Sequence, residues 1–324
     1  MRPSLPFLIF FLWLTSCTED SKNYSKRKAF DDLVSGVARY SASIETRNVN
    51  WDSLTAVYGA QVDENIGEMA FFELTAELLR HFRDPHVWLL SPSREMYTIK
   101  HLEYAQNFDE AFLDQYVRDW QTHTPTIRTG IIDGNIGYLL CTSFQGDVDT
   151  NNQGYQAAIQ RLQTTDGLII DIRPNGGGNA YNAQNLLNKI TDEKRIWHIT
   201  QNKVHDGFDT PYTWRMQPDP EVLYNEQVVV LAGRYTISAG ERFCIGAKAL
   251  PKVTLVGDTT ANTQGSIMAR EMLNGWTYTL TFEKVTDAQG VNYGGIGVPP
   301  DVYIAPTLAD GNDVTLAYAI SVLR

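Results

Sequence analysis

The apolar positions of the chain recur at helical spacing over residues 26–80. The first of them are Phe30, Leu33, Val34 and Val37. Apolar residues three and four positions apart are typical of amphipathic helices. Pro85 closes the pattern, because proline cannot continue a helix and favours an extended residue before it. We therefore predict a small N-terminal helical module, residues 26–90.

The next stretch, residues 91–128, has no clean hydrophobic period. Aromatic and acidic residues are mixed irregularly there, so we predict a connecting segment with one helix around residues 108–120. The segment also lacks the glycine-led loop and the alternating strands that are typical of a peptide-binding PDZ insert.

From residue 129 onward, short β-branched runs alternate with amphipathic stretches. This order is typical of an α/β domain with a largely parallel sheet. The predicted strands cover residues 136–140, 167–172, 227–232 and 254–256, and the predicted helices cover 155–162, 183–190 and 239–249. Residues 275–282 alternate with period two, which predicts an antiparallel or edge strand. We assign residues 129–324 to one α/β core.

The first residues combine Arg2 with an apolar run over residues 5–14, which has signal-peptide length and is too short to span a bilayer. The run ends in Leu-Thr-Ser-Cys17, which resembles the lipobox of bacterial lipoproteins, where the cysteine becomes the lipidated N-terminus after cleavage. This resemblance implies a signal peptide over residues 1–16, a lipidated Cys17 and a polar tether over residues 17–25. An ordinary signal peptide with an incidental cysteine is the alternative. Both predict export, and the lipobox predicts a lipid-anchored protein of the cell envelope, with the membrane side left open.

The composition of the chain limits the classes of partner that we expect. The 324 residues carry 27 basic and 38 acidic side chains, a formal charge of −11, so we expect no nucleic-acid partner. The histidines show no metal-ligand spacing such as His-Glu-x-x-His, and we expect neither a metal nor a cofactor. Cys141 and Cys244 lie in core-like contexts and are too few for a disulfide framework.

Two segments carry candidate chemistry. The segment 167–179 begins with a predicted buried strand and ends in the loop Arg173-Pro-Asn-Gly-Gly-Gly-Asn179. This loop lacks the Lys-Ser/Thr pair of a phosphate-binding loop. Its glycines either form a tight turn or leave backbone N–H groups open to a carbonyl oxygen. Ser238 follows the strand at residues 227–232 and begins a helix, where it is either a helix cap or a nucleophile.

Five motifs in order resemble one family. They are Asp84-Pro-His86, Asp171-Ile-Arg-Pro-Asn-Gly-Gly177, Ser238-Ala-Gly-Glu241, Val256-Gly-Asp-Thr259 and Gly295-Ile-Gly-Val-Pro-Pro-Asp301. Together they are similar to the C-terminal processing (tail-specific) protease and tricorn-core family of serine peptidases, in its tricorn-like subgroup without a PDZ domain. The resemblance covers about residues 30–304. It implies a Clp-protease/crotonase-like α/β superhelix with a small N-terminal helical module.

The resemblance also separates two catalytic designs. Thr263 stands where the processing proteases carry a base lysine, so a serine-lysine mechanism is not expected. His86 matches the base histidine of tricorn-like members, although a core histidine is the structural alternative. Pro85 and Gly294 stand where those members carry a serine and a glutamate that orient the base. Asp84 or Glu241 is left to orient the imidazole.

The function that the resemblance implies is an exported, lipid-anchored serine peptidase acting on peptides or unfolded protein through an acyl-enzyme. Ser238 is the expected nucleophile and His86 the expected base. The N–H groups of Gly177, Gly178 and Ala239 are expected to form the oxyanion hole. Asp171, Arg173 and Asp301 are expected to be scaffold residues. The alternatives are a weak or inactive family member that binds peptides or apolar ligands and, less favoured, a crotonase-like acyl enzyme. The oligomeric state is open.

Overall fold

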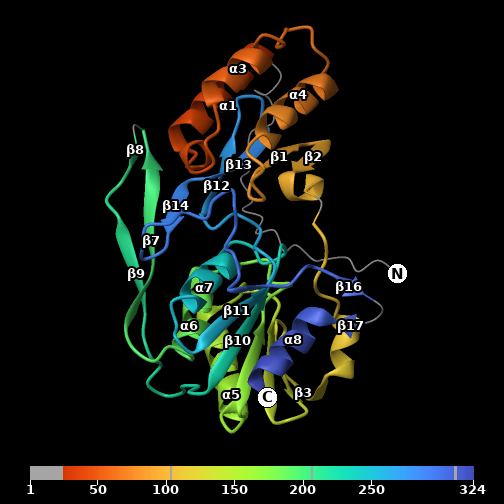
Figure 1. Ribbon diagram of the computed structural model, residues 1–324. Coiled ribbons are helices and arrows are strands. Elements are labelled where there is room, and N and C mark those ends of the chain that lie inside the picture. Colours follow the sequence, from red (N-terminus) through yellow and green to blue (C-terminus); the bar gives the residue numbers. More distant parts are fainter. Residues whose placement is uncertain (1–24, 103, 206, 310–311) are drawn as a thin grey trace.

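The computed structural model describes residues 25–102, 104–205, 207–309 and 312–324. A helical module lies at one end and a larger α/β core at the other (Figure 1). The predicted signal peptide and Cys17 lie outside the described residues. In the described part of the chain, no helix is both long enough and apolar enough to cross a membrane.

The predicted helices of the module are confirmed. They are α1 (Lys26–Tyr40), α2 (Ser43–Thr46), α3 (Trp51–Gly59) and α4 (Glu68–Arg80). Ser25 caps α1 by accepting a hydrogen bond from the Lys28 N–H, and Asn50 caps α3 in the same way through the Ser53 N–H. These side chains satisfy backbone donors that a helix start leaves unpaired.

The module is completed by strands from late in the chain. Its antiparallel sheet has the order β12 (Ile267–Glu271), β13 (Thr277–Thr281), β1 (Trp88–Ser91) and β2 (Arg94–Tyr97). Phe71 and Phe72 of α4 pack on Trp276, with ring centroids 5.2 and 5.4 Å apart. The predicted period-two strand is therefore antiparallel but central. The described strands depart from the predicted bounds at residues 90 and 129. β2 extends the module sheet to residue 97, residues 117–124 already pair in the core sheet, and residues 267–281 pair in the module sheet.

The core is a seven-stranded sheet in the order β15-β11-β10-β6-β5-β4-β3. Its parallel part consists of β5 (Ile136–Cys141), β6 (Gly167–Asp171), β10 (Gln227–Ala232), β11 (Val253–Gly257) and β15 (Val302–Tyr303). The helices α5 (Val148–Leu162), α6 (Ala180–Asn188) and α7 (Ala239–Ala247) bury their apolar side chains against one face of the sheet. The other face is covered by α8 (Val314–Leu323). The predicted α/β fold with a largely parallel sheet is confirmed.

The helix predicted around residues 108–120 is wrong. The described residues there form the 3-10 helix η3 (Glu110–Gln115) and the first part of the strand β3 (Val117–Thr124). Another 3-10 helix, η2 (Thr98–His101), precedes them. Pro125 lies in the two-residue turn between β3 and β4 (Ile127–Ile132). Pairing with β4 decides the structure here, because this segment has no apolar helical stripe to compete with it.

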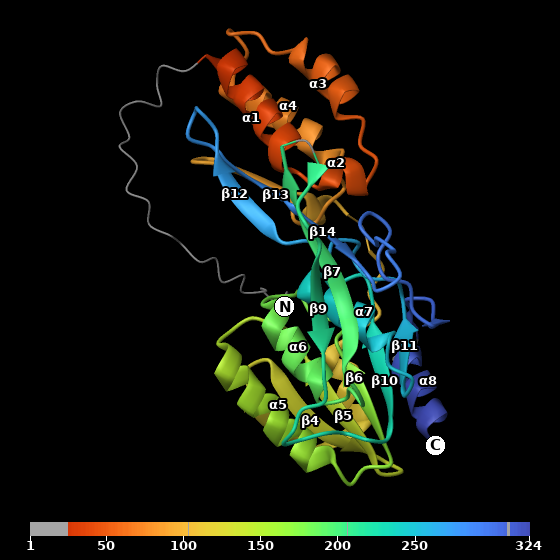
Figure 2. The same ribbon diagram turned by 90° about the vertical axis from the view of Figure 1, so that its left-hand side faces the viewer.

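An extended arm joins the two ends of the molecule and was not predicted. It consists of β7 (Arg195–Val204), β8 (Gly207–Phe208), β9 (Tyr212–Met216) and β14 (Glu283–Thr286). Figure 2 shows β7 running from the core up to the module. A last short pair, β16 (Leu308–Ala309) and β17 (Asn312–Asp313), precedes α8.

Candidate active site

Ser238 lies at the turn between β10 and α7 in a strained backbone conformation. Its φ of 59° and ψ of −117° fall in a region that side chains other than glycine rarely adopt. Such strain persists where the surrounding structure enforces it, and it is common at functional sites. Ser238 caps α7, and the Glu241 carboxylate accepts the Ser238 N–H at 3.3 Å in a capping box. The residue is nevertheless half-exposed.

The glycine loop after β6 lies directly against this serine. A Cβ on Gly177 would come within 2.7 Å of both Ser238 Cβ and the Ile237 carbonyl oxygen, and φ at Gly177 is +85°. The position therefore requires glycine. The Gly177 N–H donates to Asn175 Oδ1 at 2.9 Å, so it is engaged within the loop. In the described part of the chain, the N–H groups of Gly178 and Ala239 have no hydrogen-bond acceptor.

The His86 main chain is clamped on both sides. Asp84 Oδ1 accepts the His86 N–H at 3.0 Å, and Thr279 Oγ1 donates to the His86 carbonyl at 2.6 Å. The side chain is buried, with 9% of the residue exposed. Burial lowers the pKa of His86 to about 4; the Asp84 charge raises it, whereas the Arg47 charge lowers it further. The imidazole is therefore neutral at pH 7.

Thr263 contacts both candidate catalytic residues. Its Oγ1 lies 3.1 Å from Nδ1 of His86, and its carbonyl oxygen accepts the Ser238 N–H at 3.0 Å. Within the described residues no hydrogen bond joins the Ser238 hydroxyl directly to the imidazole. Catalytic hydrogen bonds are often long or poorly aligned without substrate and form fully when substrate binds.

Glu241 organises the loop that carries Thr263. Its buried carboxylate accepts hydrogen bonds from the N–H groups of Asn262 and Thr263 at 2.8 and 2.7 Å, and from Thr260 Oγ1 at 2.5 Å. Burial raises the pKa of Glu241, and these hydrogen bonds lower it in part. Glu241 thus acts on the imidazole through Thr263, since none of its hydrogen bonds in the described chain reaches the ring.

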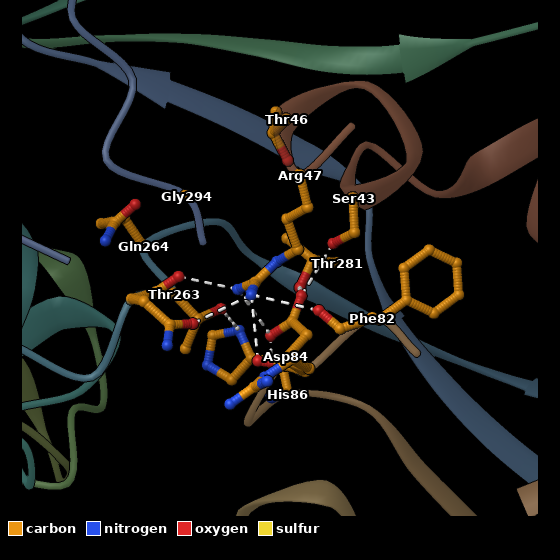
Figure 3. A network of polar contacts seen from close by, with 12 residues as sticks. Ser43, Thr46, Arg47, Phe82, Asp84, His86, Thr263, Gln264, Thr281 and Gly294 are labelled. Atoms are coloured by element: carbon orange, nitrogen blue, oxygen red, sulfur yellow. Dashed lines mark hydrogen bonds and ion pairs between the residues drawn. The ribbon is translucent and has the colours of Figure 1, made fainter. Parts of the chain in front are cut away.

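Asp84 is fixed by several partners (Figure 3). Ser43 Oγ and Thr281 Oγ1 donate to Asp84 Oδ2 at 2.7 and 2.8 Å, and Arg47 forms an ion pair with Asp84 at 3.4 Å. Burial alone would raise the pKa of Asp84, but the charges of Arg47 and His86 and these hydrogen bonds lower it to about 2. Asp84 therefore stays ionised, and it positions the His86 backbone rather than its ring.

Arg47 connects the helical module to the active-site loop. Its guanidinium donates to the Asn262 carbonyl at 2.7 Å, to Asn262 Oδ1 at 2.9 Å and to the Arg83 carbonyl at 3.0 Å. Sequence reasoning missed Arg47, because an isolated arginine after a short helix carries no local signal. For Thr263 a signal existed, since it stands at the position of the family lysine.

The structure also explains one departure from the tricorn-like pattern. A Cβ on Gly294 would come within 2.9 Å of Asn292 Oδ1 and 3.4 Å of the Thr46 side chain. A glutamate at this position would need its neighbours to move. The glycine leaves room for the Asn292 side chain, which accepts the Gly294 N–H at 3.0 Å.

A buried network of charged residues supports the glycine loop that follows β6. Arg173 donates to both Asp313 carboxylate oxygens at 2.8 Å and through Nε to Asp171 at 3.0 Å. Tyr138 donates to Asp171 at 2.7 Å. Asp301 lies elsewhere, accepting the Leu255 N–H at 2.9 Å. These residues contact backbone and one another, as scaffold residues do.

The described residues contain no group of three or more His, Cys, Asp and Glu side chains placed to hold a metal ion. Cys141 and Cys244 are free and buried. Burial raises the pKa of the Cys141 thiol to about 12, so this thiol is not a nucleophile at neutral pH.

A largely parallel sheet with a serine at a strand-to-helix turn and a glycine loop beside it defines an α/β fold of the Clp-protease-like class. A sequence profile of peptidase family S41 matches residues 135–304, more than half of the chain. The chain therefore belongs to peptidase family S41. The predicted family and fold are both confirmed.

Two curated relatives support this placement. The carboxy-terminal processing protease CtpA of Bacillus subtilis (strain 168) is 28% identical over 179 residues, which is 55% of this chain and 36% of CtpA. The tricorn protease of Thermoplasma acidophilum is 28% identical over 195 residues, which is 59% of this chain and 17% of that protein. The chain thus spans about a third of the first relative and less than a fifth of the second.

Solved structures share the fold along nearly the whole chain. A candidate peptidase of Parabacteroides merdae ATCC 43184 superposes with a TM-score of 0.84 at 24% identity, covering 93% of this chain and 97% of that one. Mature CPAF in complex with lactacystin gives 0.72 at 13% identity, covering 92% and 98%. The photosystem II D1 C-terminal processing protease gives 0.56 at 16% identity, covering 91% and 97%.

Proposed function

We propose that this protein is a serine-type peptidase that cleaves peptide bonds in peptides or unfolded proteins through an acyl-enzyme. Ser238 attacks the peptide carbonyl and His86 is the general base. The observation that supports this assignment is the position of Thr263, which contacts the His86 ring through its hydroxyl and the Ser238 N–H through its carbonyl. Membership of family S41 supports the reaction class.

His86 handles the proton in this proposal. Its low pKa keeps the imidazole in the neutral form that can accept a proton at pH 7, and makes it a weaker base than an imidazole of ordinary pKa. Because Nδ1 faces Thr263, we assign Nε2 to take the Ser238 proton and return it to the leaving amine. A hydroxyl stabilises an imidazolium less than a carboxylate on the same ring nitrogen would, so the proposed rate is lower than that of members with the glutamate.

The developing oxyanion is stabilised by the two unpaired N–H groups of Gly178 and Ala239. Ala239 is the first residue of α7, so the helix dipole adds to its N–H. The Gly177 N–H instead fixes the loop through Asn175. This assignment keeps Gly178 and Ala239 of the predicted oxyanion hole and gives Gly177 a structural part.

A serine-reactive fluorophosphonate probe tests the proposal. We expect the folded wild type to be labelled, Ser238→Ala to remain unlabelled, and His86→Gln to be labelled at least a hundredfold more slowly. Cleavage of an unfolded protein substrate should follow the same order. An unlabelled, folded wild type would overturn the peptidase proposal.

A second candidate is a family member that binds peptides or apolar ligands with weak or no catalysis. It is favoured by one observation: in the described residues the His86 ring has a hydroxyl partner where other members have a carboxylate. This candidate predicts equal peptide binding by wild type and Ser238→Ala, measured by fluorescence anisotropy, with no probe labelling of either.

We further infer that the protein is exported and lipid-anchored through Cys17. The support is the apolar run that ends in Leu-Thr-Ser-Cys17. Metabolic labelling with a radioactive fatty acid should mark the wild-type protein and leave Cys17→Ser unmarked. Equal labelling, or recovery of unlabelled wild type in the soluble fraction, would overturn the anchor.

A further inference from the structure

A cavity of about 470 Å³ opens on the helical module, between α1, β12 and the turn that follows β7. Its polar lining consists of Asp32, Ser35, Arg39, Tyr40, His205 and Arg270. None of the residues assigned to catalysis above lines it. A volume of this size is typical of sites for small molecules, and the proposed peptidase reaction gives the cavity no role.

The lining of the cavity has an excess of positive charge, in a protein whose net charge is −11. It contains Arg39 from α1 and Arg270 from β12, but only one carboxylate, that of Asp32. In the described part of the chain, neither arginine forms an ion pair, and the buried Nε of Arg270 has no hydrogen-bond partner. Unpaired cations in a recess of the surface attract anions, because the low-dielectric walls focus their field.

The ring of Tyr40 positions both guanidinium groups. The Arg270 guanidinium lies 4.4 Å from the ring centroid and the Arg39 guanidinium 5.3 Å from it, and an aromatic ring attracts cations at such distances. Gly36 of α1 allows this close packing, since a Cβ there would lie 3.4 Å from Arg270 Nε and 2.2 Å from Tyr278 Oη. The two cations are therefore held in place before a ligand binds, which lowers the entropic cost of binding.

We infer that the cavity binds a phosphate group between Arg39 and Arg270. Guanidinium groups donate paired hydrogen bonds to phosphate oxygens. A phosphate presents its oxygens in several directions, so it can accept from two guanidinium groups that come from different elements, whereas the two oxygens of a carboxylate lie in one plane. A phosphate monoester also has a charge of about −1.5 to −2 at pH 7, close to that of the two arginines. The ligand is a small phosphate compound or the headgroup of a phospholipid.

Isothermal titration calorimetry with inorganic phosphate and with acetate tests the site. We expect the wild type to bind phosphate with a Kd of about 1 mM or lower, and acetate at least about tenfold more weakly. Arg39→Gln, whose side chain is exposed, and Arg270→Gln should each weaken phosphate binding about tenfold. Arg118→Gln is the matched control, an exposed arginine on β3 that should leave binding unchanged.

Asp32→Asn provides a test that loss of folding cannot imitate. Removing the one carboxylate of the lining should tighten phosphate binding about threefold or more. Asp31→Asn removes the same charge from the neighbouring position, where the side chain pairs with Arg27, and should leave the Kd nearly unchanged. Absence of phosphate binding, equal affinity for acetate, or a Kd that neither the arginine variants nor Asp32→Asn alters would each overturn the site.

Vesicles of phosphatidylcholine, with and without phosphatidylglycerol, distinguish the two sources of the phosphate group. Cys17→Ser is the protein used, so that the predicted lipid anchor does not hold it on the vesicles. Cosedimentation with phosphatidylglycerol vesicles that inorganic phosphate reverses would support a lipid headgroup. Binding of phosphate without cosedimentation would support a small phosphate compound, and cosedimentation retained by the double variant Arg39→Gln and Arg270→Gln would count against the cavity. These measurements require no catalysis, so they stand or fall separately from the peptidase proposal.

Discussion

Thr263 Oγ1 lies 3.1 Å from Nδ1 of His86, although the two residues stand 177 positions apart in the sequence. The threonine occupies the position that carries the base lysine in the processing-protease design. In this chain the position contacts the histidine that we propose as the base. The Thr263 carbonyl also accepts the Ser238 N–H, so one residue contacts both the proposed base and the proposed nucleophile.

The Thr263 hydroxyl should therefore contribute to catalysis beyond its contribution to folding. Thr263→Val keeps the shape of the side chain and removes the hydrogen bond, which is worth about 0.5–1.5 kcal/mol. We expect kcat/KM on a peptide substrate to fall by about three- to tenfold. Thr263→Ser should restore most of the rate. An unchanged rate in Thr263→Val with intact folding would show that the hydroxyl has no part in the reaction.

The pH profile should report the low pKa of His86. The acidic limb of kcat/KM is expected near pH 4, where the folded imidazole takes up its proton. Arg47→Gln removes a charge that lowers this pKa, so its limb should move to higher pH. Arg118→Gln, an exposed control, should leave the limb in place. A wild-type limb near pH 6.5 would contradict the role of burial at His86.

The same groups make stability depend on pH. The folded pKa of His86 lies below its ordinary value of 6.5, and that of Asp84 lies below 3.8. The unfolded chain therefore binds more protons from pH 6.5 down to about 4 at His86, and from pH 3.8 down to about 2 at Asp84. The free energy of unfolding should fall as pH falls through both windows. Urea titrations of wild type and His86→Gln check this, since the variant should have a shallower slope between pH 6.5 and 4. Part of the slope should remain, because burial also lowers the pKa of His198.

The sequence located the core strands closely because buried parallel strands are apolar along their whole length. The predicted strand at residues 227–232 has the bounds of β10, and the one at 167–172 extends a single residue beyond β6. The pairing of β13 with β1 could not be predicted from local sequence patterns, because it depends on Trp276 packing against α4. Strand pairing that depends on contacts between residues far apart in the sequence produces no periodic pattern of apolar residues.

The candidate site likewise has a part that sequence motifs indicate and a part that they do not. The structure brings Gly177 against Ser238, and both lie in motifs with a recognisable order of residues. Thr263 and Arg47 act through a hydroxyl and a guanidinium whose partners come from distant segments. The residues that flank Thr263 and Arg47 in the sequence do not indicate these partners. The motifs therefore indicated the Ser238 loop, Asp84 and Glu241, whereas the contacts of Arg47 and of the Thr263 hydroxyl were not predicted.

Breaking the buried charge network of Arg173, Asp171 and Asp313 should lower the free energy of unfolding strongly. Arg173→Met would leave Asp171 and Asp313 buried without their cation, and such losses cost about 3–5 kcal/mol. Arg195→Met, which removes exposed ion pairs with Asp192 and Glu193, should cost about 0–1 kcal/mol. Urea unfolding gives both values. Equal effects in the two variants would show that the buried network adds nothing to stability.

The neighbouring glycines Gly176 and Gly177 offer the sharpest test of the loop geometry. A methyl group at Gly177 would come within 2.7 Å of Ser238 Cβ at a φ of +85°, whereas one at Gly176 would meet nothing within 4 Å. Gly177→Ala must therefore displace the loop or the serine, and a shift of about 1 Å at reacting groups can cost about a hundredfold in rate. We expect its fluorophosphonate labelling to fall by about that factor, and Gly176→Ala to be labelled like the wild type. Circular dichroism should show both variants folded. Equal labelling of the two would mean that Ser238 does not depend on the glycine loop, because the substitutions differ mainly in how closely the added methyl approaches it.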